Sequence, residues 1–471
     1  MRKFALIAAF AVLISAPVAA QDSSPRDLDP SSMEAKQADD VTAQDPDDGP
    51  LRGTVTDDSA WQDLGIAIAA FATNDDVPTP ANAQGTAALG LELSRIVYND
   101  LRFNGLFRPV GPDALPRPRY AQITAPAWNT WRGRSAEMLV HGFVRDNGDG
   151  RLTVGCYLYD VALQTELDRA GWVVAPSEWR RAAHRCADFV YSRLSGESPF
   201  FDSRIAYIAE TGPKDNRVKR LAIMDSDGAN HRFITNGQST ALTPRYSPDY
   251  SRIAYLSYVD GNPRIYVYEI DSGRQTLVTQ SSNPTFAPRW SPDGRSILYS
   301  MAIGGNTDIY RVSATGGGTP IRLTDSPSIE VGGSYSPDGS QIVFESDQSG
   351  SQQCYVMNAN GTGQRRISFF GGRCATPEWS PRGDQIAFTH IAGDFRIAVM
   401  TPSGRNMRQL TNAWHDEGPT WAPNGRIIQF FRTERGSGDT SIWQVDLTGE
   451  NERRLRTPVG ASDPAWGPVL P

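Results

Sequence analysis

Beyond its first twenty residues, the sequence contains no long hydrophobic run. A transmembrane helix needs about 18 to 20 consecutive apolar residues, and no later segment approaches that length. The apolar stretch within Met1–Ala20 follows Arg2 and Lys3, ends at Val18-Ala19-Ala20, and is not directly followed by a cysteine that could carry a lipid. These features are typical of a cleaved signal peptide. The sequence therefore predicts an exported protein without direct membrane insertion.

Catalytic and metal-binding signatures are also lacking. The five histidines are scattered, with no His-Glu-x-x-His motif, and there is no Gly-x-Ser-x-Gly, Walker A or dinucleotide fingerprint. The Asp-rich segments 146–150 and 225–228 lack the glutamate that completes an EF-hand, and they are typical of hairpin turns. We expect no cofactor and no metal; an active site in a central channel is the remaining enzymatic alternative.

The sequence has no excess of positive charge. Its net charge of −7 argues against nucleic acid as a partner. Residues 21–50 are rich in Asp, Glu, Ser, Pro and Gln, with almost no large apolar side chains. Such a segment cannot bury enough surface to fold. We expect a disordered acidic arm there, with ordered structure beginning near Leu51.

A turn recurs along the second half of the chain. An aromatic residue precedes Ser-Pro-Asp-Gly or a close variant, and the turn prolines are Pro248, Pro292, Pro337, Pro381, Pro423 and Pro468. Ser, Pro, Asp and Gly in this order suit a type I turn. Short strands rich in β-branched and aromatic residues complete each unit of about 44 residues. This period and composition are typical of a β-propeller blade.

The repeats predict six blades within residues 198–471. The segment Arg204–Tyr207 matches the second strand of the other units, but no turn motif precedes it. The segment Asp463–Pro468 has the turn motif but no strands after it. We therefore expect the C-terminal strand to complete the first blade and to close the all-β ring, which removes its exposed edges.

Residues 51–197 predict an α/β domain instead. An apolar strand surrounds Ile66, helical spacing covers Leu89–Leu101, and a hairpin spans residues 136–161. A last helix begins at Pro176-Ser177 and ends at Gly196, directly before the propeller.

The four cysteines divide evenly between the two domains. Cys156 and Cys186 lie on the apolar faces of a strand and of the last helix, and Cys354 and Cys374 lie in the propeller. The pairing Cys156–Cys186 and Cys354–Cys374 is the simplest of the three possible connectivities for an exported chain. The alternative is that each cysteine is a small buried apolar residue.

Several segments are similar to those of the TolB family, which belongs to the Tol–Pal envelope system of Gram-negative bacteria. They are Glu92–Arg95, Asn99–Leu101, Gly105–Phe107, Leu158–Val161, Ala187–Gly196 and Phe200–Tyr207. The order of signal peptide, α/β domain and six-bladed propeller also matches. The resemblance extends over residues 51–468.

The resemblance implies a non-enzymatic, monomeric periplasmic protein with two partners. A propeller face would bind Pal, the peptidoglycan-associated outer-membrane lipoprotein, and the N-terminal segment would engage the inner-membrane protein TolA. This cycle would support outer-membrane invagination at cell division and envelope integrity. Either the acidic arm or the segment Leu51, Arg52, Gly53, Thr54 and Val55 would contact TolA.

The segments that lead into each first strand are the candidate lipoprotein site. Seven residues before the turn prolines stand Ala241, Thr285, Glu330, Cys374, Asp416 and Ala461, which we expect to surround one mouth of the channel. Binding residues often lie on loops of a rigid scaffold. We predict a site formed by Thr285, Glu330, His415, Asp416 and Glu417. Two alternatives remain, that this loop is merely solvated and that the chain is an exported scaffold or glycan binder outside the Tol system.

Overall fold

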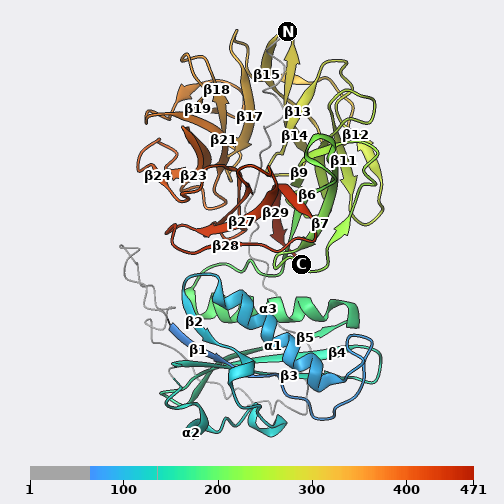
Figure 1. Ribbon diagram of the computed structural model, residues 1–471, viewed down its shortest axis with the longest axis vertical. Helices are drawn as coiled ribbons and strands as arrows, with labels where there is room; N and C mark the ends of the chain where they lie inside the picture. Colours follow the sequence, from blue (N-terminus) through green and yellow to red (C-terminus); the bar gives the residue numbers. More distant parts are fainter. Residues whose placement is uncertain (1–63, 135) are drawn as a thin grey trace, which may run out of the picture. The chain divides into compact units, whose positions relative to one another are not determined.

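A computed structural model describes residues 64–134 and 136–471 (Figure 1). These residues form two compact units, one ending at Asp202 and the other spanning Ser203–Pro471. The predicted signal peptide, the acidic arm and Leu51–Val55 lie outside the described residues.

The N-terminal unit contains a five-stranded sheet with strand order β2-β1-β3-β4-β5. Strand β1 pairs in parallel with β2 and β3, and β3, β4 and β5 continue as antiparallel neighbours. The predicted hairpin is β3–β4, whereas β2 and β5 were not predicted. The strands are β1 (Leu64–Ile68), β2 (Phe107–Val110), β3 (Met138–Asp146), β4 (Leu152–Asp160) and β5 (Thr165–Val174).

Two long helices, α1 (Thr86–Arg102) and α3 (Trp179–Ser195), pack against each other and against the sheet (Figure 1). Helix α1 buries Leu89, Leu93, Ile96 and Val97, whose spacing places them on one face. Helix α3 ends at Gly196, whose left-handed conformation favours glycine at this cap position. A disulfide joins Cys156 of β4 to Cys186 of α3.

The link after α3 is held by one buried carboxylate. Asp188 accepts hydrogen bonds from the backbone N–H groups of Phe200, Phe201 and Asp202, at 2.7, 2.8 and 2.9 Å. Residues 200–202 are thereby attached to α3, and the compact N-terminal unit extends to Asp202. This contact could not be predicted, because Asp188 lies within a helix and its partners belong to the following loop.

The second unit is a six-bladed β-propeller, as predicted, in which each blade is a four-stranded antiparallel sheet. The first, innermost strands are β29 (Gly460–Val469), β9 (Ala241–Tyr246), β13 (Thr285–Trp290), β17 (Glu330–Tyr335), β21 (Arg373–Trp379) and β25 (Asp416–Trp421). The second strands are β6 (Ser203–Thr211), β10 (Arg252–Ser257), β14 (Ser296–Ile303), β18 (Gln341–Ser346), β22 (Ile386–Ala392) and β26 (Ile427–Thr433).

The third strands are β7 (Val218–Asp225), β11 (Arg264–Glu269), β15 (Asn306–Ser313), β19 (Gln353–Asn358), β23 (Asp394–Met400) and β27 (Thr440–Asp446). The short outer strands are β8 (Arg232–Phe233), β12 (Gln275–Leu277), β16 (Ile321–Arg322), β20 (Arg365–Arg366), β24 (Arg408–Gln409) and β28 (Glu452–Arg454). Closure by the C-terminal strand is confirmed, because β29 pairs antiparallel with β6 and places Trp466 opposite Ile205.

The repeated turn connects the first and second strands of a blade. The N–H of Gly294 donates to the carbonyl of Ser291 at 2.9 Å, and Gly339 and Ser336 make the equivalent bond. The preceding aromatic residue is buried and contacts the neighbouring blade. For example, the indole N–H of Trp290 donates to the carbonyl of Arg245 at 3.0 Å. The motif therefore serves both the turn and the packing between blades.

A β-bulge interrupts every innermost strand, and the sequence analysis missed it. The bulge residues have positive φ values between 49° and 67°; they are Thr243, Ala287, Gly332, Thr376, Gly418 and Asp463. Several bulge N–H groups donate to a side chain of the preceding blade, as Thr376 does to Glu345 Oε2 at 3.0 Å. A bulge bends the strand and increases its twist. A disulfide between Cys354 of β19 and Cys374 of β21 also joins adjacent blades.

Candidate partner-binding face of the propeller

The innermost strands begin at one face of the propeller, which we call the entrance face. Two kinds of segment form it: the loops between second and third strands, and the connections from an outer strand to the next innermost strand. They are hydrogen-bonded to each other, as in Thr285 N–H to Pro263 O at 3.0 Å and Phe395 N–H to Trp414 O at 3.0 Å. The Ser-Pro turns lie at the other end of these strands.

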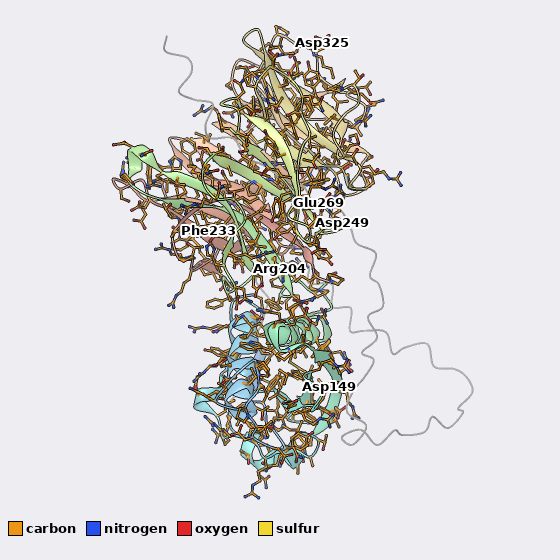
Figure 2. The ribbon with its side chains drawn as sticks, turned by 90° about the vertical axis from the view of Figure 1, so that its right-hand side faces the viewer. Asp149, Arg204, Phe233, Asp249, Glu269 and Asp325 are labelled. Carbon is orange, nitrogen blue, oxygen red and sulfur yellow. A yellow bond between two sulfur atoms is a disulfide. The ribbon has the colours of Figure 1, made fainter. Side chains whose placement is uncertain are left out.

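Side chains of the two faces can be followed in Figure 2. Asp249 of a Ser-Pro turn and Glu269 at the end of β11 lie near each other, where the N–H of Ile270 donates to the carbonyl of Ser251 at 2.9 Å. Asp325, on a connection that leads to an innermost strand, lies away from them. The predicted site residues stand at or next to the starts of the innermost strands and therefore belong to the entrance face.

The predicted ring around the channel mouth is buried, and this corrects the sequence analysis. All six positions have no exposed surface; they are Ala241, Thr285, Glu330, Cys374, Asp416 and Ala461. They were expected in loops, but they lie within the first two residues of their strands. Thr285, Glu330 and Asp416 therefore cannot contact a docked protein while the propeller keeps this conformation.

Asp416 is part of a buried ion pair. Its carboxylate accepts two hydrogen bonds from Arg432, from Nε at 2.6 Å and from Nη2 at 2.8 Å. Arg432 also binds Glu452 at 2.7 Å and lies 4.2 Å from the ring centre of Trp443. A buried bidentate pair of this kind is costly to break from one side, because it leaves an unpaired charge. The arrangement is that of a structural contact.

Glu330 and Thr285 also bond within the propeller. Burial raises the pKa of Glu330, and hydrogen bonds from Thr324 and Ser326 oppose this rise. Ser326 Oγ donates to Glu330 Oε1 at 2.8 Å, whereas Oε2 is buried without a partner. The hydroxyl of Thr285 lies 2.8 Å from that of Thr279. Neither side chain is oriented to solvent.

His415 and Glu417 are the two predicted site residues that remain partly accessible. Their side chains are 23% and 12% exposed, and His415 Nε2 lies 3.0 Å from Glu417 Oε2. The imidazole stacks on Phe395, with ring centres 4.4 Å apart and an interplanar angle of 1°. The structure thus places these two residues together in one ordered corner of the entrance face.

Most of the exposed large apolar side chains of the described propeller residues lie on the entrance face, and the sequence analysis did not predict them. The described propeller residues include eight exposed large hydrophobic side chains, and six lie on this face: Tyr258, Val259, Ile303, Ile329, Phe369 and Trp414. The other two, Phe233 and Ile321, belong to outer strands. Phe369 is 74% exposed, and Trp414 contacts His415 edge-on at 4.9 Å. Aromatic side chains are enriched at protein interfaces, so the entrance face is the candidate interaction surface.

Charged side chains are buried behind this face, in the interior of the propeller. Burial lowers the pKa of Arg245 to about 10 and holds that of Arg289 well below its usual range. Burial raises the pKa of Glu345 to about 8, against opposing hydrogen bonds from Thr376 and Gln352, and raises that of Glu378. Burial thus disfavours the charged form of each of these four groups, and none of them is a nucleophile paired with a base.

In the part of the chain that the structure describes, no helix has both the length and the apolar character needed to cross a bilayer. The fold and the entrance face define a two-domain β-propeller protein. The model of the TolB beta propeller domain matches residues 191–470, and that of the TolB amino-terminal domain matches residues 57–167. These matches cover more than half of the sequence, and the chain belongs to the TolB family.

Named relatives extend this similarity over the whole length. The Tol-Pal system protein TolB 1 of Novosphingobium aromaticivorans is 66% identical over 466 residues, which cover 99% of both chains. The Tol-Pal system protein TolB of Rhizorhabdus wittichii is 60% identical over 410 residues, covering 87% of this chain and 93% of the relative. The crystal structure of TolB from Acinetobacter baumannii matches with a TM-score of 0.75 and 27% identity, covering 86% of this chain and 97% of that one.

Proposed function

We propose that this protein is a non-enzymatic periplasmic component of the Tol–Pal system that binds an outer-membrane lipoprotein through the entrance face. Its N-terminal segment would bind the inner-membrane partner. The observation that carries the proposal is the concentration of exposed apolar side chains on one face of a rigid propeller. The relatives named for the Tol-Pal system support it. In the cell, exchange between the two partners would support outer-membrane invagination at division and envelope integrity.

The predicted ring is buried, so we choose the contact residues by the exposure of their side chains. Aromatic side chains usually dominate binding energy when they become buried at the centre of an interface. Phe369 and Trp414 are both accessible, and Trp414 adjoins the ordered pair His415–Glu417. We therefore assign the main anchors to Phe369 and Trp414, with polar contacts from His415 and Glu417.

The test is calorimetric titration of the protein with the soluble domain of the lipoprotein. The double variant Phe369→Ala/Trp414→Ala should bind at least about 30-fold more weakly, since each anchor typically contributes about 1–2 kcal/mol or more. The matched control is Phe233→Ala, which removes an exposed aromatic side chain from the outer strand β8. Unchanged affinity in the double variant would move the site away from this face. If the native protein does not bind the lipoprotein domain, the proposed function is wrong.

The inner-membrane contact is tested separately by deletion of residues 21–55. The shortened protein should keep its affinity for the lipoprotein and lose binding to the periplasmic part of the inner-membrane partner. Deleting residues 21–50 alone distinguishes the acidic arm from Leu51–Val55. Retained binding after the longer deletion would show that the contact lies elsewhere.

A further inference from the structure

The connection between β2 and β3 carries an excess of positive charge. Residues 114–136 contain four arginines and no acidic residue. We call these arginines the basic cap: Arg117, Arg119, Arg132 and Arg134. All four side chains are exposed, and none of them forms an ion pair with an acidic side chain among the residues that the structure describes.

Apolar side chains of the same connection attach it to the sheet of the N-terminal unit. Leu115, Ile123 and Trp131 are buried in a core cluster with residues of β3 and β4. Because these apolar side chains face the sheet, the arginines between them are left on the outer surface.

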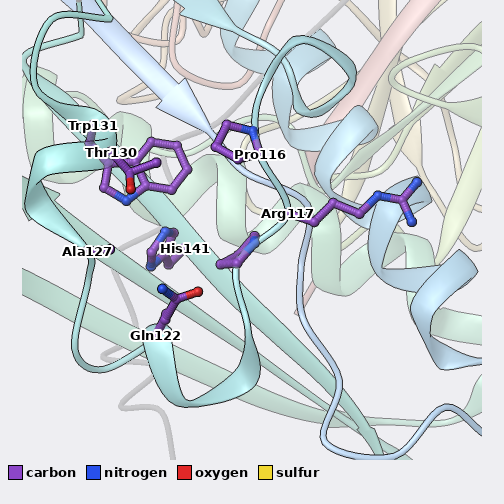
Figure 3. Close-up of a pocket in the computed structure, with 8 residues that line it drawn as sticks. Pro116, Arg117, Gln122, Ala127, Thr130, Trp131 and His141 are labelled. Carbon is purple, nitrogen blue, oxygen red and sulfur yellow. The ribbon is translucent and has the colours of Figure 1, made fainter.

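The arginines of the basic cap lie around one small region of that surface. Arg117 lines a cavity together with Gln122 and Thr130, and Figure 3 shows its guanidinium extending away from the cavity. Gln122 Oε1 accepts the backbone N–H of Arg119 at 2.8 Å, and the carbonyl of Thr130 accepts a hydrogen bond from Arg134 Nε at 2.8 Å. The fourth arginine lies between Thr130 and Arg134 in the chain.

The acidic residues at the two ends of this connection do not balance the cap. Asp113 is within electrostatic reach of Arg117, but it forms an ion pair with Arg95 at 2.6 Å. Glu137 Oε2 accepts the N–H of Gly65 at 2.7 Å. Even if Glu137 offsets one arginine, the other three positive charges of the cap remain in excess.

The complementary charge belongs to the acidic arm of the same chain. Residues 21–50 contain nine acidic and two basic side chains, which gives a net charge of −7. The whole chain also has a net charge of −7, so the residues outside the arm carry equal numbers of positive and negative charges. The arm is therefore the main source of unbalanced negative charge in the protein.

The arm is attached to the described chain next to the basic cap. Only residues 51–63 separate it from Leu64, where β1 begins. The adjacent Gly65 accepts the backbone N–H of Glu137 at 2.9 Å, and Glu137 is three residues from Arg134. A short tether gives an effective concentration on the order of millimolar, so ion pairs that are individually weak suffice for substantial occupancy.

We propose that the acidic arm folds back onto the basic cap and covers its four arginines. Such a contact uses many interchangeable carboxylates and needs no folded structure in the arm, in agreement with its composition. It goes beyond the proposed function, because it is a contact within the chain and needs neither partner. While the arm is bound, the cap is closed to other polyanions.

The test is arginine labelling with p-hydroxyphenylglyoxal, read by mass spectrometry, of the chain that begins at Gln21 and of a chain that lacks residues 21–50. At an effective concentration of about twice the dissociation constant, the arm covers the cap about two thirds of the time, so its deletion should speed labelling of the four arginines about threefold. Arg365 and Arg454, two exposed arginines of the propeller, are the controls and should be labelled at the same rate in both chains.

Variants of unchanged length separate the charge of the arm from its bulk. One variant replaces five aspartates of the arm by asparagine: D27N, D39N, D40N, D45N and D47N. It lowers the net charge of the arm from −7 to −2 and should act like the deletion. The matched control replaces uncharged residues and should keep the protection: S23N, S24N, S31N and S32N. Protection should also disappear in about 1 M NaCl, where the Debye length is about 3 Å.

Equal labelling of the basic cap in the full and shortened chains would overturn the proposal. Protection that increases with protein concentration would also overturn it, because the arm would then cover the cap of a second copy. Vesicles that contain phosphatidylglycerol are added to both chains as a competing anion. If they protect the cap equally in the two chains, the cap is a lipid-binding surface that the arm does not cover.

Discussion

At the scale of single residues, burial distinguishes charged side chains that hold the fold together from side chains that are accessible to a partner. Asp416 and Glu417 are neighbours in sequence, yet Asp416 is locked to Arg432 inside the blade and Glu417 lies beside the accessible His415. Both are acidic residues, so residue type alone could not show which of the two is accessible. Phe369 and Phe370 pose the same problem, because Phe369 is 74% exposed and Phe370 packs against the core. Which of two adjacent residues faces solvent depends on where the strand ends, and the sequence did not reveal that.

Glu345 makes stability depend on pH. Its Oε2 accepts the N–H of Thr376 at 3.0 Å, its Oε1 has no partner, and burial raises its pKa from 4.5 to about 8. The folded protein therefore binds more protons than the unfolded chain between about pH 4.5 and 8. Stability is fully present below this range and falls as pH rises through it, by at most about 1.4 kcal/mol per pH unit for one group.

Urea denaturation at pH 5 and at pH 8 measures this effect. Glu345→Gln removes the ionisable group and should reduce the loss of stability between the two pH values. Glu450→Gln, at an exposed position, is the control and should leave the pH dependence as it is. An unchanged pH dependence in Glu345→Gln would show that Glu345 ionises normally in the folded state.

Among the secondary-structure elements, the innermost strands differ most from their prediction. The strands and turns of each blade could be predicted because the motif repeats, and short runs rich in β-branched and aromatic residues mark the strands. The bulges could not, because their positions hold Thr, Ala, Gly and Asp without a common type. Only the pairing of two strands makes the extra residue visible. The same lack of pairing information concealed β2 and β5 in the N-terminal unit.

A glycine at a bulge position should contribute measurably to the free energy of unfolding. Gly332 has a φ of 67°, and an added Cβ would meet no atom within 4 Å, so Gly332→Ala tests backbone strain without a steric clash. A non-glycine residue in the left-handed region costs about 1–2 kcal/mol. We expect Gly332→Ala to lower the free energy of unfolding by about this amount.

Chemical denaturation compares this variant with Gly371→Ala. Gly371 also has open space around its Cβ position, but its φ is not in the left-handed region. Gly371→Ala should therefore be neutral or slightly stabilising, since alanine restricts the unfolded chain. Equal stabilities of the two variants would mean that the bulge tolerates a side chain without strain.

At the scale of the whole molecule, the sequence was most informative about the fold and least about the binding surface. Ring closure could be predicted from two incomplete units. The C-terminal turn motif has no strands after it, and the first blade has no turn before it, so each supplies what the other lacks. The order of the two domains followed from the different patterns of residues 51–197 and 198–471, and it matches that of the family. The binding surface depends on the accessibility of many loops at once, and no local pattern encodes it. Tyr258 and Ile329 look like core residues until the blades are assembled.

Ring closure predicts that the C-terminal strand stabilises the entire propeller. Deleting residues 460–471 removes β29, exposes the edge of β6, and takes Ala465 from the core cluster that contains Ala206 and Ile208. It also removes the buried Trp466, whose indole donates to Ser203 Oγ at 2.9 Å. Loss of a buried aromatic side chain alone costs about 3–5 kcal/mol, and the loss of a strand should exceed this.

Thermal unfolding followed by circular dichroism, together with size-exclusion chromatography, tests this expectation. The truncated protein should unfold at a much lower temperature and over a broader range, because the blades no longer form a closed cooperative ring. The newly exposed β6 edge should also promote association of copies. Deleting only Leu470 and Pro471, which lie beyond β29, is the control and should leave the transition almost unchanged. If the longer deletion unfolds like the full chain, β29 contributes little to the cohesion of the ring, and the remaining interblade contacts, including the Cys354–Cys374 disulfide, suffice to hold it.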